Sequence, residues 1–232
     1  MDLAKESLCV KRKVIQKLYD GGLFPYTRRY LKTLVNHFNT IGLCGRNECC
    51  LNFLGVDITT EKGKSFAEQV LQHMRERMQD YQEQTGDLFN LEATPAESTS
   101  YRLAKHDKEQ FPDIITSGDK EPFYTNSSQL PVDFTSDVFE ALDMQESLQT
   151  KYTGGTMFHV YMGEAIKDWK ACADLVRTIS NKYRIPFFTI SPTYSICPVH
   201  GYLSGQHFEC PVCKAEKEKA LKEKLLILEA EK

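Results

Sequence analysis

The stretch SICPVHGYLSGQHFECPVC, residues 195–213, constrains the fold of this chain more than any other. It contains a Cys-x2-His pair and a Cys-x2-Cys pair separated by nine residues. Two residues between ligands let one tight turn direct both side chains at a single ion, and three thiolates with one imidazole complete a tetrahedral shell for Zn²⁺. We therefore predict a zinc site whose ligands are Cys197, His200, Cys210 and Cys213.

Other interpretations of this cluster compete with zinc. A redox dithiol would explain the Cys-x2-Cys pair but not the matching Cys-x2-His pair. An iron–sulfur cluster usually takes four thiolates, and this stretch has three. Chance pairing of turns is disfavoured because Pro198 and Pro211 stiffen both turns. His207 is a competing ligand outside the spacing. Four protein ligands leave no open coordination position, so the metal is expected to be structural.

Charge and hydropathy exclude several classes of partner. The 29 Lys and Arg residues nearly balance 32 Asp and Glu residues, for a net charge of −3. This balance gives no basis for general binding to nucleic acid or to a membrane, so any anionic ligand needs a local site. We expect no signal peptide in the polar amino terminus, and no apolar run reaches the ~20 residues of a membrane span. We expect a cytoplasmic protein whose eight cysteines are reduced, buried or metal-bound.

Predicted strands alternate with helices of ten or more residues, which is typical of a parallel α/β fold. Gly21, Gly45 and Gly86 are expected to end or interrupt elements. Predicted helices include a long amphipathic one over 66–81, one capped by Ser136, and one from about Glu164 to Tyr183 that buries Trp169 and Ile179. Predicted strands lie in TIGLC, LFNLEA, EPFYTNSSQLP, GGTMFHVYMG and IPFFTISPTYSI.

The segment ATPAESTSYR, residues 93–102, is a polar loop between a predicted strand and a predicted helix. Backbone amides at a helix start are unsatisfied, and Ser98, Thr99 and Ser100 add hydroxyl donors, a combination that suits phosphate. Serine-rich loops of this kind are also common as plain helix caps. Residue chemistry alone leaves both interpretations open.

Several long segments resemble one family in order: NLEATPAESTSYRLA, PFYTNSSQLPV, LQTKYTGGTMFHVYMGE and FFTISPTYSICPVHGYLSGQHFECPVC. GLFPYTRRYL and TIGLCGRNECCLNFLG extend the match toward the amino terminus. They are similar to the anaerobic, class III ribonucleoside-triphosphate reductases. The resemblance covers nearly the whole chain except its lysine- and glutamate-rich tail.

The resemblance implies half of a ten-stranded α/β barrel, over residues 1–194, followed by a zinc-binding module at 195–213 and a charged helical tail or linker at 214–232. It also implies that PAESTS forms the loop that holds the phosphates of a ribonucleoside triphosphate. That role falls on Ala96, Glu97, Ser98, Thr99 and Ser100, with the Glu97 side chain directed away from the polyanion. The cysteine cluster corresponds to the zinc site of the family.

The family's radical groups have no counterpart among these residues, so no catalytic residue is predicted here. The resemblance implies a glycyl radical in the complete enzyme, made by a radical-SAM activating enzyme, a thiyl cysteine on a finger loop, and formate as reductant. Cys44, Cys49 and Cys50 are expected to be buried structural thiols. Glu92, His159 and Glu164 are weaker acid–base candidates, and His159 is expected to be a satisfied, half-buried histidine.

We therefore expect one part of an anaerobic reductase, inactive alone and completed by the remaining amino-terminal part of the enzyme. It should bind substrate phosphates and carry structural zinc. The rival hypothesis is a non-catalytic zinc-binding interaction module derived from the same family. A different glycyl-radical enzyme conflicts with PAESTS and CPVHGYL.

Overall fold

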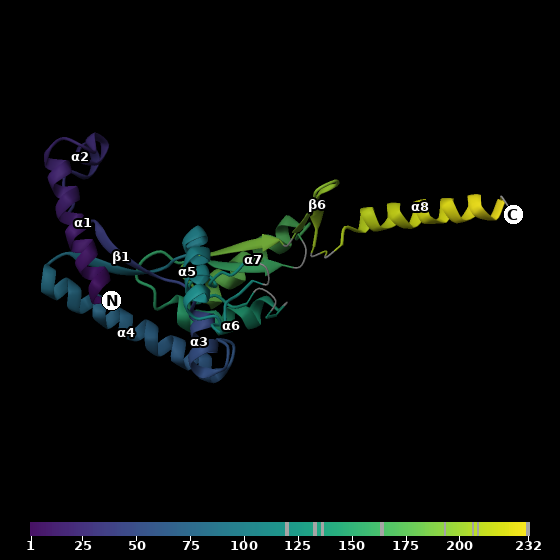
Figure 1. Ribbon diagram of the computed structural model, residues 1–232. Coiled ribbons are helices and arrows are strands. Elements are labelled where there is room, and N and C mark those ends of the chain that lie inside the picture. The colour runs from purple at the N-terminus through teal and green to yellow at the C-terminus, as the bar shows by residue number, and fades with distance from the viewer. Residues whose placement is uncertain are drawn as a thin grey trace.

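The computed structural model describes residues 1–118, 121–131, 134–135, 137–162, 165–192, 194–205, 207 and 209–230 (Figure 1). The elements, in chain order, are α1 (Asp2–Asp20), α2 (Pro25–Leu31), β1 (Phe38–Leu43), α3 (Arg46–Leu54), α4 (Glu61–Thr85), β2 (Leu88–Ala93), α5 (Glu97–Gln110), α6 (Val138–Gln149), β3 (Phe158–Met162), α7 (Trp169–Lys182), β4 (Phe188–Pro192), β5 (Tyr194–Cys197), β6 (Gly201–Ser204) and α8 (Pro211–Ala230).

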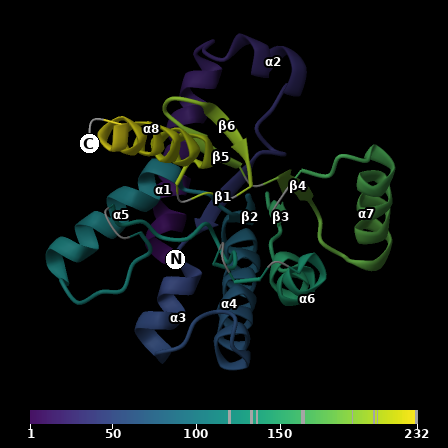
Figure 2. The same ribbon diagram turned by 90° about the vertical axis from the view of Figure 1, so that its right-hand side faces the viewer.

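The four central strands form two parallel pairs, β1 with β2 and β3 with β4. The loop before β3 connects the pairs, because the amide of Gly154 donates to Leu91 O at 2.7 Å and the amide of Ala93 donates to Gly155 O at 2.8 Å. The four strands therefore follow one another across the centre of the molecule (Figure 2). Parallel strands alternating with helices confirm the predicted α/β class.

The larger core lies between α4 and the first strand pair. Thr60 caps α4 by accepting from the amide of Gly63 at 3.1 Å, and Gly86 ends it at φ 73°. Residues three and four apart turn one helical face toward the sheet, so Leu71 and Tyr81 are fully buried against Leu91. Burying a leucine such as Leu71 contributes about 2 kcal/mol. This packing fixes the position of the carboxyl end of β2.

A smaller core packs α6 and α7 beneath the second pair through Leu142, Val160 and Ile179. α7 begins at Trp169 because the Asp168 carboxylate accepts from an amide of its first turn at 2.9 Å, later than the predicted start near Glu164, which lies outside the described residues. The predicted burial of Trp169 is wrong, since it is 73% exposed. Ile179 is buried as expected.

The predicted strand in EPFYTNSSQLP is also wrong: the structure has only a single bridge there, between Ser117 and Phe123. The backbone of this segment bonds to the start of α3 instead of to a strand, because the amides of Gly45 and Arg46 donate to carbonyls of residues 125 and 127. α6 is capped by Asp137, and the expected cap Ser136 lies outside the described residues.

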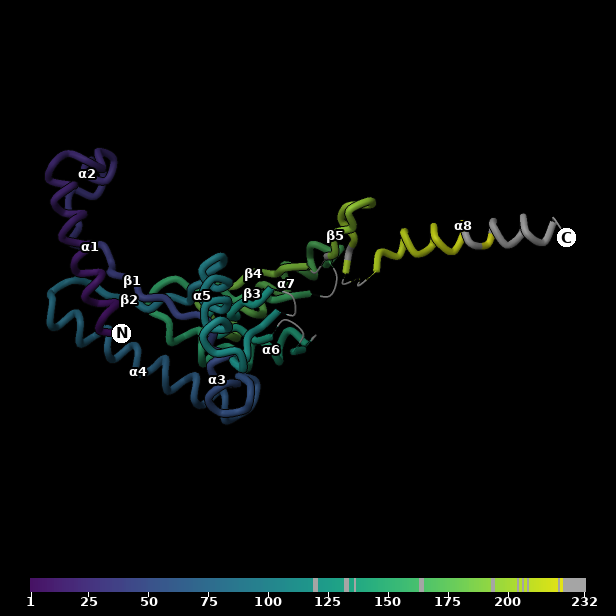
Figure 3. The backbone as a smooth tube through the Cα atoms, viewed as in Figure 1, coloured from purple at the N-terminus to yellow at the C-terminus, as the bar shows by residue number. Residues whose placement is uncertain are grey.

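The carboxyl-terminal part departs from the layered body. β5 and β6 form a short antiparallel hairpin, and α8 extends from it away from the other elements (Figures 1 and 3). The side chains of residues 214–220 are exposed, as expected for the charged tail. Across the described part of the chain, we find no helix with the length and apolarity needed to cross a membrane.

Candidate metal centre and polar loop

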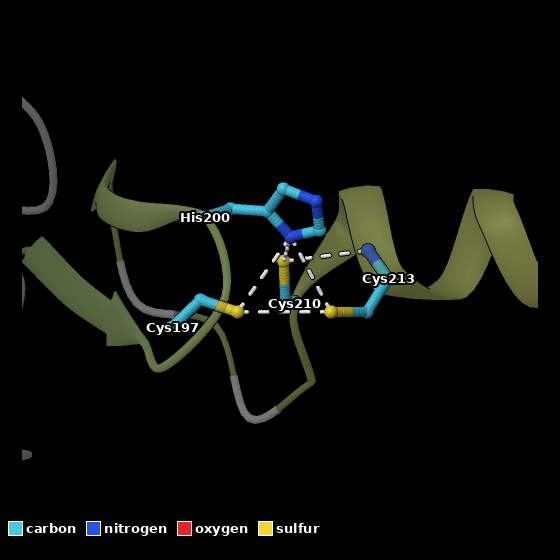
Figure 4. A group of neighbouring side chains, drawn as sticks. All are labelled: Cys197, His200, Cys210 and Cys213. Atoms are coloured by element: carbon cyan, nitrogen blue, oxygen red, sulfur yellow. Dashed lines mark hydrogen bonds between the residues drawn. The ribbon is translucent and has the colours of Figure 1, made fainter.

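Two local segments, residues 197–200 and 210–213, bring the predicted metal ligands together. Cys197 ends β5, His200 lies in the turn before β6, Cys210 precedes α8, and Cys213 lies in the first turn of α8. Gly201 leaves the hairpin turn at φ 71°, a conformation that glycine adopts without strain. The four donor atoms all lie within 4.8 Å of one another, and their side chains converge on one point (Figure 4).

The spacing of these donor atoms fits a single tetrahedral ion. His200 Nδ1 lies 3.7 Å from Cys197 Sγ, 3.5 Å from Cys210 Sγ and 3.4 Å from Cys213 Sγ. Cys197 Sγ and Cys213 Sγ are 3.6 Å apart. Bonds of about 2.3 Å to sulfur and about 2.0 Å to nitrogen in a tetrahedral zinc site place two sulfurs about 3.8 Å apart and sulfur and nitrogen about 3.5 Å apart. The observed distances agree with this geometry to within a few tenths of an ångström.

Backbone amides also prepare the site for anionic sulfur. The amides of Val199 and Cys213 donate to Cys197 Sγ and Cys210 Sγ, each at 3.4 Å. Amides of His200 and Val199 lower the pKa of the Cys197 thiol to about 6. The hydrogen bond with Cys197 and burial raise the pKa of the Cys213 thiol to about 11. The amides around Cys197 therefore favour its thiolate, which is the form that binds a metal ion.

His207 is not part of this group of donors, and its amide donates to Ser195 Oγ at 2.8 Å. All eight cysteines are free thiols, as expected. Cys50 is buried, whereas the predicted burial of Cys49 is wrong: it is exposed and accepts from Arg46 Nη1 at 3.2 Å. Cys44 is half-buried.

The polar loop begins where β2 ends and leads into α5. Ala96 and Glu97 both have left-handed backbone conformations, with φ of 57° and 28°. Such values are uncommon for residues other than glycine, asparagine and aspartate, and strain of this kind often occurs where a loop clamps a ligand. The amides of Thr99 and Ser100 donate to Ala96 O, at 2.7 and 3.0 Å. The earlier amides, those of Glu97 and Ser98, belong to the helix start, where the helix itself supplies no acceptor.

Ser100 anchors the loop. Its hydroxyl donates to Tyr124 O at 2.6 Å and accepts from the amide of Tyr124 at 3.0 Å, and the side chain is buried. The hydroxyl proton of Ser100 is therefore already used in a hydrogen bond, whereas Ser98 and Thr99 are exposed residues. Tyr124 is fixed in turn by donating its hydroxyl to Asp107 Oδ2 at 2.6 Å.

The starts of two helices lie at the same edge of the strand pair. Leu43 and Ala93 are partners in register, so α3 and α5 both begin just beyond the carboxyl ends of β1 and β2. A Cβ on Gly45 would lie 3.1 Å from the Tyr124 side chain, so α3 starts in close contact with the residue that anchors the polar loop. Helix starts carry partial positive charge, and ligands of parallel sheets bind at this edge.

Sequence reasoning missed one residue that holds this edge together. Glu48 on α3 is 1% exposed, and its carboxylate accepts from the hydroxyls of Ser117 and Thr125, each at 2.5 Å, and from the amide of Thr125 at 3.1 Å. These donors follow Glu48 by 69 and 77 residues, so no local pattern marks the contact. The sequence offered one indication of this role: Glu48 lies in the apolar stretch NECCLNF, and a glutamate buried there needs polar partners.

The weaker acid–base candidates lie elsewhere. His159 lines a cavity of about 410 Å³ together with Asn126 and Tyr161, and its Nδ1 lies 3.4 Å from Ser191 Oγ. It is half-buried with a polar neighbour, as expected. Glu92 is half-buried on β2, and Glu164 lies outside the described residues.

The fold and the site define the class of this protein. It is an α/β protein with helix starts gathered at one edge of its parallel strands and with a carboxyl-terminal Cys3His module. Comparison with known proteins is consistent with that class. A family model described as anaerobic ribonucleoside-triphosphate reductase matches residues 1–223. The chain belongs to that family.

Curated relatives carry the same description. The enzyme of Enterobacteria phage T4 is 25% identical over 230 residues, which cover 92% of this chain and 36% of the relative. The enzyme of Haemophilus influenzae is 24% identical over 186 residues, or 73% of this chain and 26% of the relative. The chain thus spans about a third or less of the length of these relatives.

A solved structure is also similar. The anaerobic ribonucleotide reductase of Thermotoga maritima, determined in complex with dATP and CTP, superimposes with a TM-score of 0.67 at 28% identity. The match covers 91% of this chain and 35% of the Thermotoga protein.

Proposed function

We propose that this chain supplies the substrate phosphate loop and a structural zinc site of an anaerobic ribonucleoside-triphosphate reductase. The complete enzyme would convert ribonucleoside triphosphates to deoxyribonucleoside triphosphates by radical chemistry, with formate as reductant. In this proposal the chain is inactive alone, and the radical glycine and the thiyl cysteine are supplied by the remaining parts of the enzyme.

The observation that carries the proposal is the polar loop at the carboxyl edge of β1 and β2. Ala96 and Glu97 have strained, left-handed backbone conformations where α5 starts, and α3 starts at the same edge of the strand pair. Free helix-start amides with partial positive charge are well suited to bind phosphate. The direct contacts would come from Glu97, Ser98 and Thr99, with Ala96 shaping the turn and Ser100 anchoring it through Tyr124.

Zinc is the metal that best fits the knuckle. Three sulfurs and one imidazole nitrogen at tetrahedral spacing are a typical zinc donor set, and four protein ligands leave no position for water or substrate. When bound, the ion would therefore supply a crosslink rather than catalysis. It would connect the β5–β6 hairpin to the first turn of α8.

Completion by the rest of the reductase would explain the exposed apolar face of α1. Leu3, Val10 and Val14 on that helix are all more than half exposed. Exposed apolar patches of this kind commonly mark an interface. We propose that the amino-terminal part of the enzyme covers such surfaces and closes the half-barrel into a ten-stranded barrel. A radical-SAM activating enzyme would then introduce the glycyl radical into the complete protein.

Reconstitution tests the proposal. The chain would be mixed with the remaining part of a related reductase and its activating enzyme, then supplied with formate and a ribonucleoside triphosphate under anaerobic conditions. We expect deoxynucleotide formation that requires both the chain and formate. Formation of a stable complex without any turnover would instead support a non-catalytic zinc-binding interaction module.

A charge added at Ser98 should separate phosphate binding from stability. Ser98→Asp places a carboxylate in the first turn of α5, where it complements the helix dipole and leaves stability unchanged or slightly raised. The same carboxylate would repel phosphate, so we expect affinity for inorganic triphosphate to fall about tenfold or more. Calorimetric titration and thermal unfolding measure the two effects. Ser98→Ala is the control, and equal affinity in Ser98→Asp would contradict phosphate binding at this loop.

Metal retention should weaken as pH falls. Protons compete with the ion at every ligand: hydrogen bonding to Cys197 raises the pKa of His200, and the pKa of Cys213 is raised to about 11. Cys197, with a pKa of about 6, adds a further competing proton only in more acidic solution. Chelator competition between about pH 8 and about pH 5 should show affinity falling throughout and most steeply at the acidic end. An affinity independent of pH would exclude thiolate ligation.

A further inference from the structure

A carboxylate from the tail helix lies on the far side of the imidazole in the candidate metal centre. His200 turns Nδ1 toward the three sulfurs, so Nε2 faces outward (Figure 4). Glu216 Oε1 lies 3.4 Å from this Nε2. The imidazole is therefore held between the sulfur cluster and a residue of α8 that the metal ligands do not include.

Helix geometry explains how α8 reaches both sides of the ring. Glu216 follows Cys213 by three residues, and residues three apart lie on the same face of an α-helix. Cys213 Sγ meets the Nδ1 side at 3.4 Å, while Glu216 meets the Nε2 side. A single turn of α8 thus contacts both nitrogens of His200.

The charged residue next to Glu216 pairs with a different carboxylate, and Glu216 remains the partner of the His200 ring. Lys217, the next residue on α8, pairs with Glu209 at 3.2 Å, so this lysine is drawn toward the segment before Cys210. The Lys217–Glu209 pair and the Glu216–His200 contact together tie the first turns of α8 to the knuckle on two sides.

We propose that Glu216 is a positioning residue of the metal centre. Its carboxylate accepts a hydrogen bond from Nε2–H of His200, which fixes the tautomer with a bare Nδ1 and holds the ring plane toward the sulfurs. Metal-ligating histidines commonly donate their second N–H to a carboxylate, and this contact strengthens the ligand. The inference rests on the proposed zinc site and extends it: the first turns of α8 become part of the metal module.

The expected effect is moderate because the contact is partly solvated. Loss of such a partner typically weakens metal affinity 10- to 100-fold. The Glu216 side chain is 64% exposed and that of His200 is 23% exposed, so solvent screens the interaction. We expect Glu216→Ala to weaken zinc affinity roughly fivefold to tenfold. Glu216→Gln keeps an acceptor oxygen without the charge. Its zinc affinity should therefore lie between that of the wild type and that of Glu216→Ala.

The test measures zinc affinity of the full chain by competition with a chromophoric chelator. Glu218→Ala is the matched control, since Glu218 is an exposed glutamate two residues further along the same helix. It should leave affinity within about twofold of the wild type. A second background, His200→Cys, replaces the imidazole by a thiol, so adding Glu216→Ala there should no longer weaken zinc binding.

The tautomer of His200 gives a second readout that does not depend on zinc affinity. In the zinc-loaded wild-type chain, nitrogen-15 NMR of His200 should show Nδ1 bound to metal and Nε2 carrying a proton. In zinc-loaded Glu216→Ala, this Nε2 proton should exchange faster with solvent, whereas Glu218→Ala should leave its exchange unchanged. A purely structural effect of Glu216 on α8 would not change the exchange of this proton selectively.

The possible results distinguish failure of the zinc site from failure of the role of Glu216. Absence of zinc binding by the wild-type chain would refute the metal site itself. Zinc binding by the wild type with equal affinity in Glu216→Ala, or an equal loss in Glu218→Ala, would refute the role of Glu216 alone. The same loss for Glu216→Ala with and without His200→Cys would also refute it, because the effect would not pass through the imidazole.

Discussion

Replacing Cys213 with serine is expected to abolish metal retention and to unfold the hairpin beside it. The strands β5 and β6 are only four residues each, and Ile196 and Tyr202 on them are 65% and 75% exposed. An isolated two-stranded hairpin is marginally stable in water, so this one has little apolar burial to hold it. Metal binding can supply on the order of 10 kcal/mol to such a module, and in this protein it would be the main source of its stability.

The measurements are zinc content and hydrogen exchange. Purified wild-type chain should contain about one zinc per chain, and Cys213→Ser should contain less than about a tenth of that. Amide protection in the hairpin should be lost, while α4 and the strand pairs, which have their own cores, should keep theirs. Cys49→Ser is the control, because Cys49 is an exposed thiol outside the cluster. Full zinc content in Cys213→Ser, or a protected hairpin after chelation, would contradict the proposed crosslink.

The grouping of Cys197, His200, Cys210 and Cys213 at one point could be predicted from sequence because their spacing is local. Each pair of ligands is separated by two residues within one turn, so spacing alone determines that both side chains can reach the same ion. Strands β1–β4 and the long helix α4 also followed from local periodicity and glycine positions, whereas the predicted strand in EPFYTNSSQLP did not form. Glu48 and Ser100 could not be assigned this way, since their partners Ser117, Tyr124 and Thr125 are distant in sequence.

The wrong predictions of side-chain burial have a related cause. Trp169 and Cys49 lie on helices whose sequences are apolar enough to suggest a core, yet both are exposed. An apolar face indicates that a surface is suited to be covered, but the covering element can belong to another segment or another part of the protein.

The edge that carries the polar loop depends on one buried carboxylate, so Glu48→Ala is expected to have the largest effect on the stability of the body. The variant would leave two hydroxyls and one amide without their acceptor in a buried site. Each unsatisfied buried donor costs about 1–3 kcal/mol, and partial access of water limits the total, so we expect a loss of about 3 kcal/mol in the free energy of unfolding.

The same variant should also weaken phosphate binding without touching the loop. Thr125 is held by Glu48, and its neighbour Tyr124 holds Ser100, so loss of the carboxylate would release the anchor of the strained turn at Ala96. Urea unfolding measures the stability, and titration with inorganic triphosphate under folding conditions measures the binding. Glu6→Ala removes an exposed carboxylate from α1 and should change neither. If Glu48→Ala unfolds within about 0.5 kcal/mol of the wild type, the buried carboxylate does not fix this edge, and the loop must be held by its own backbone.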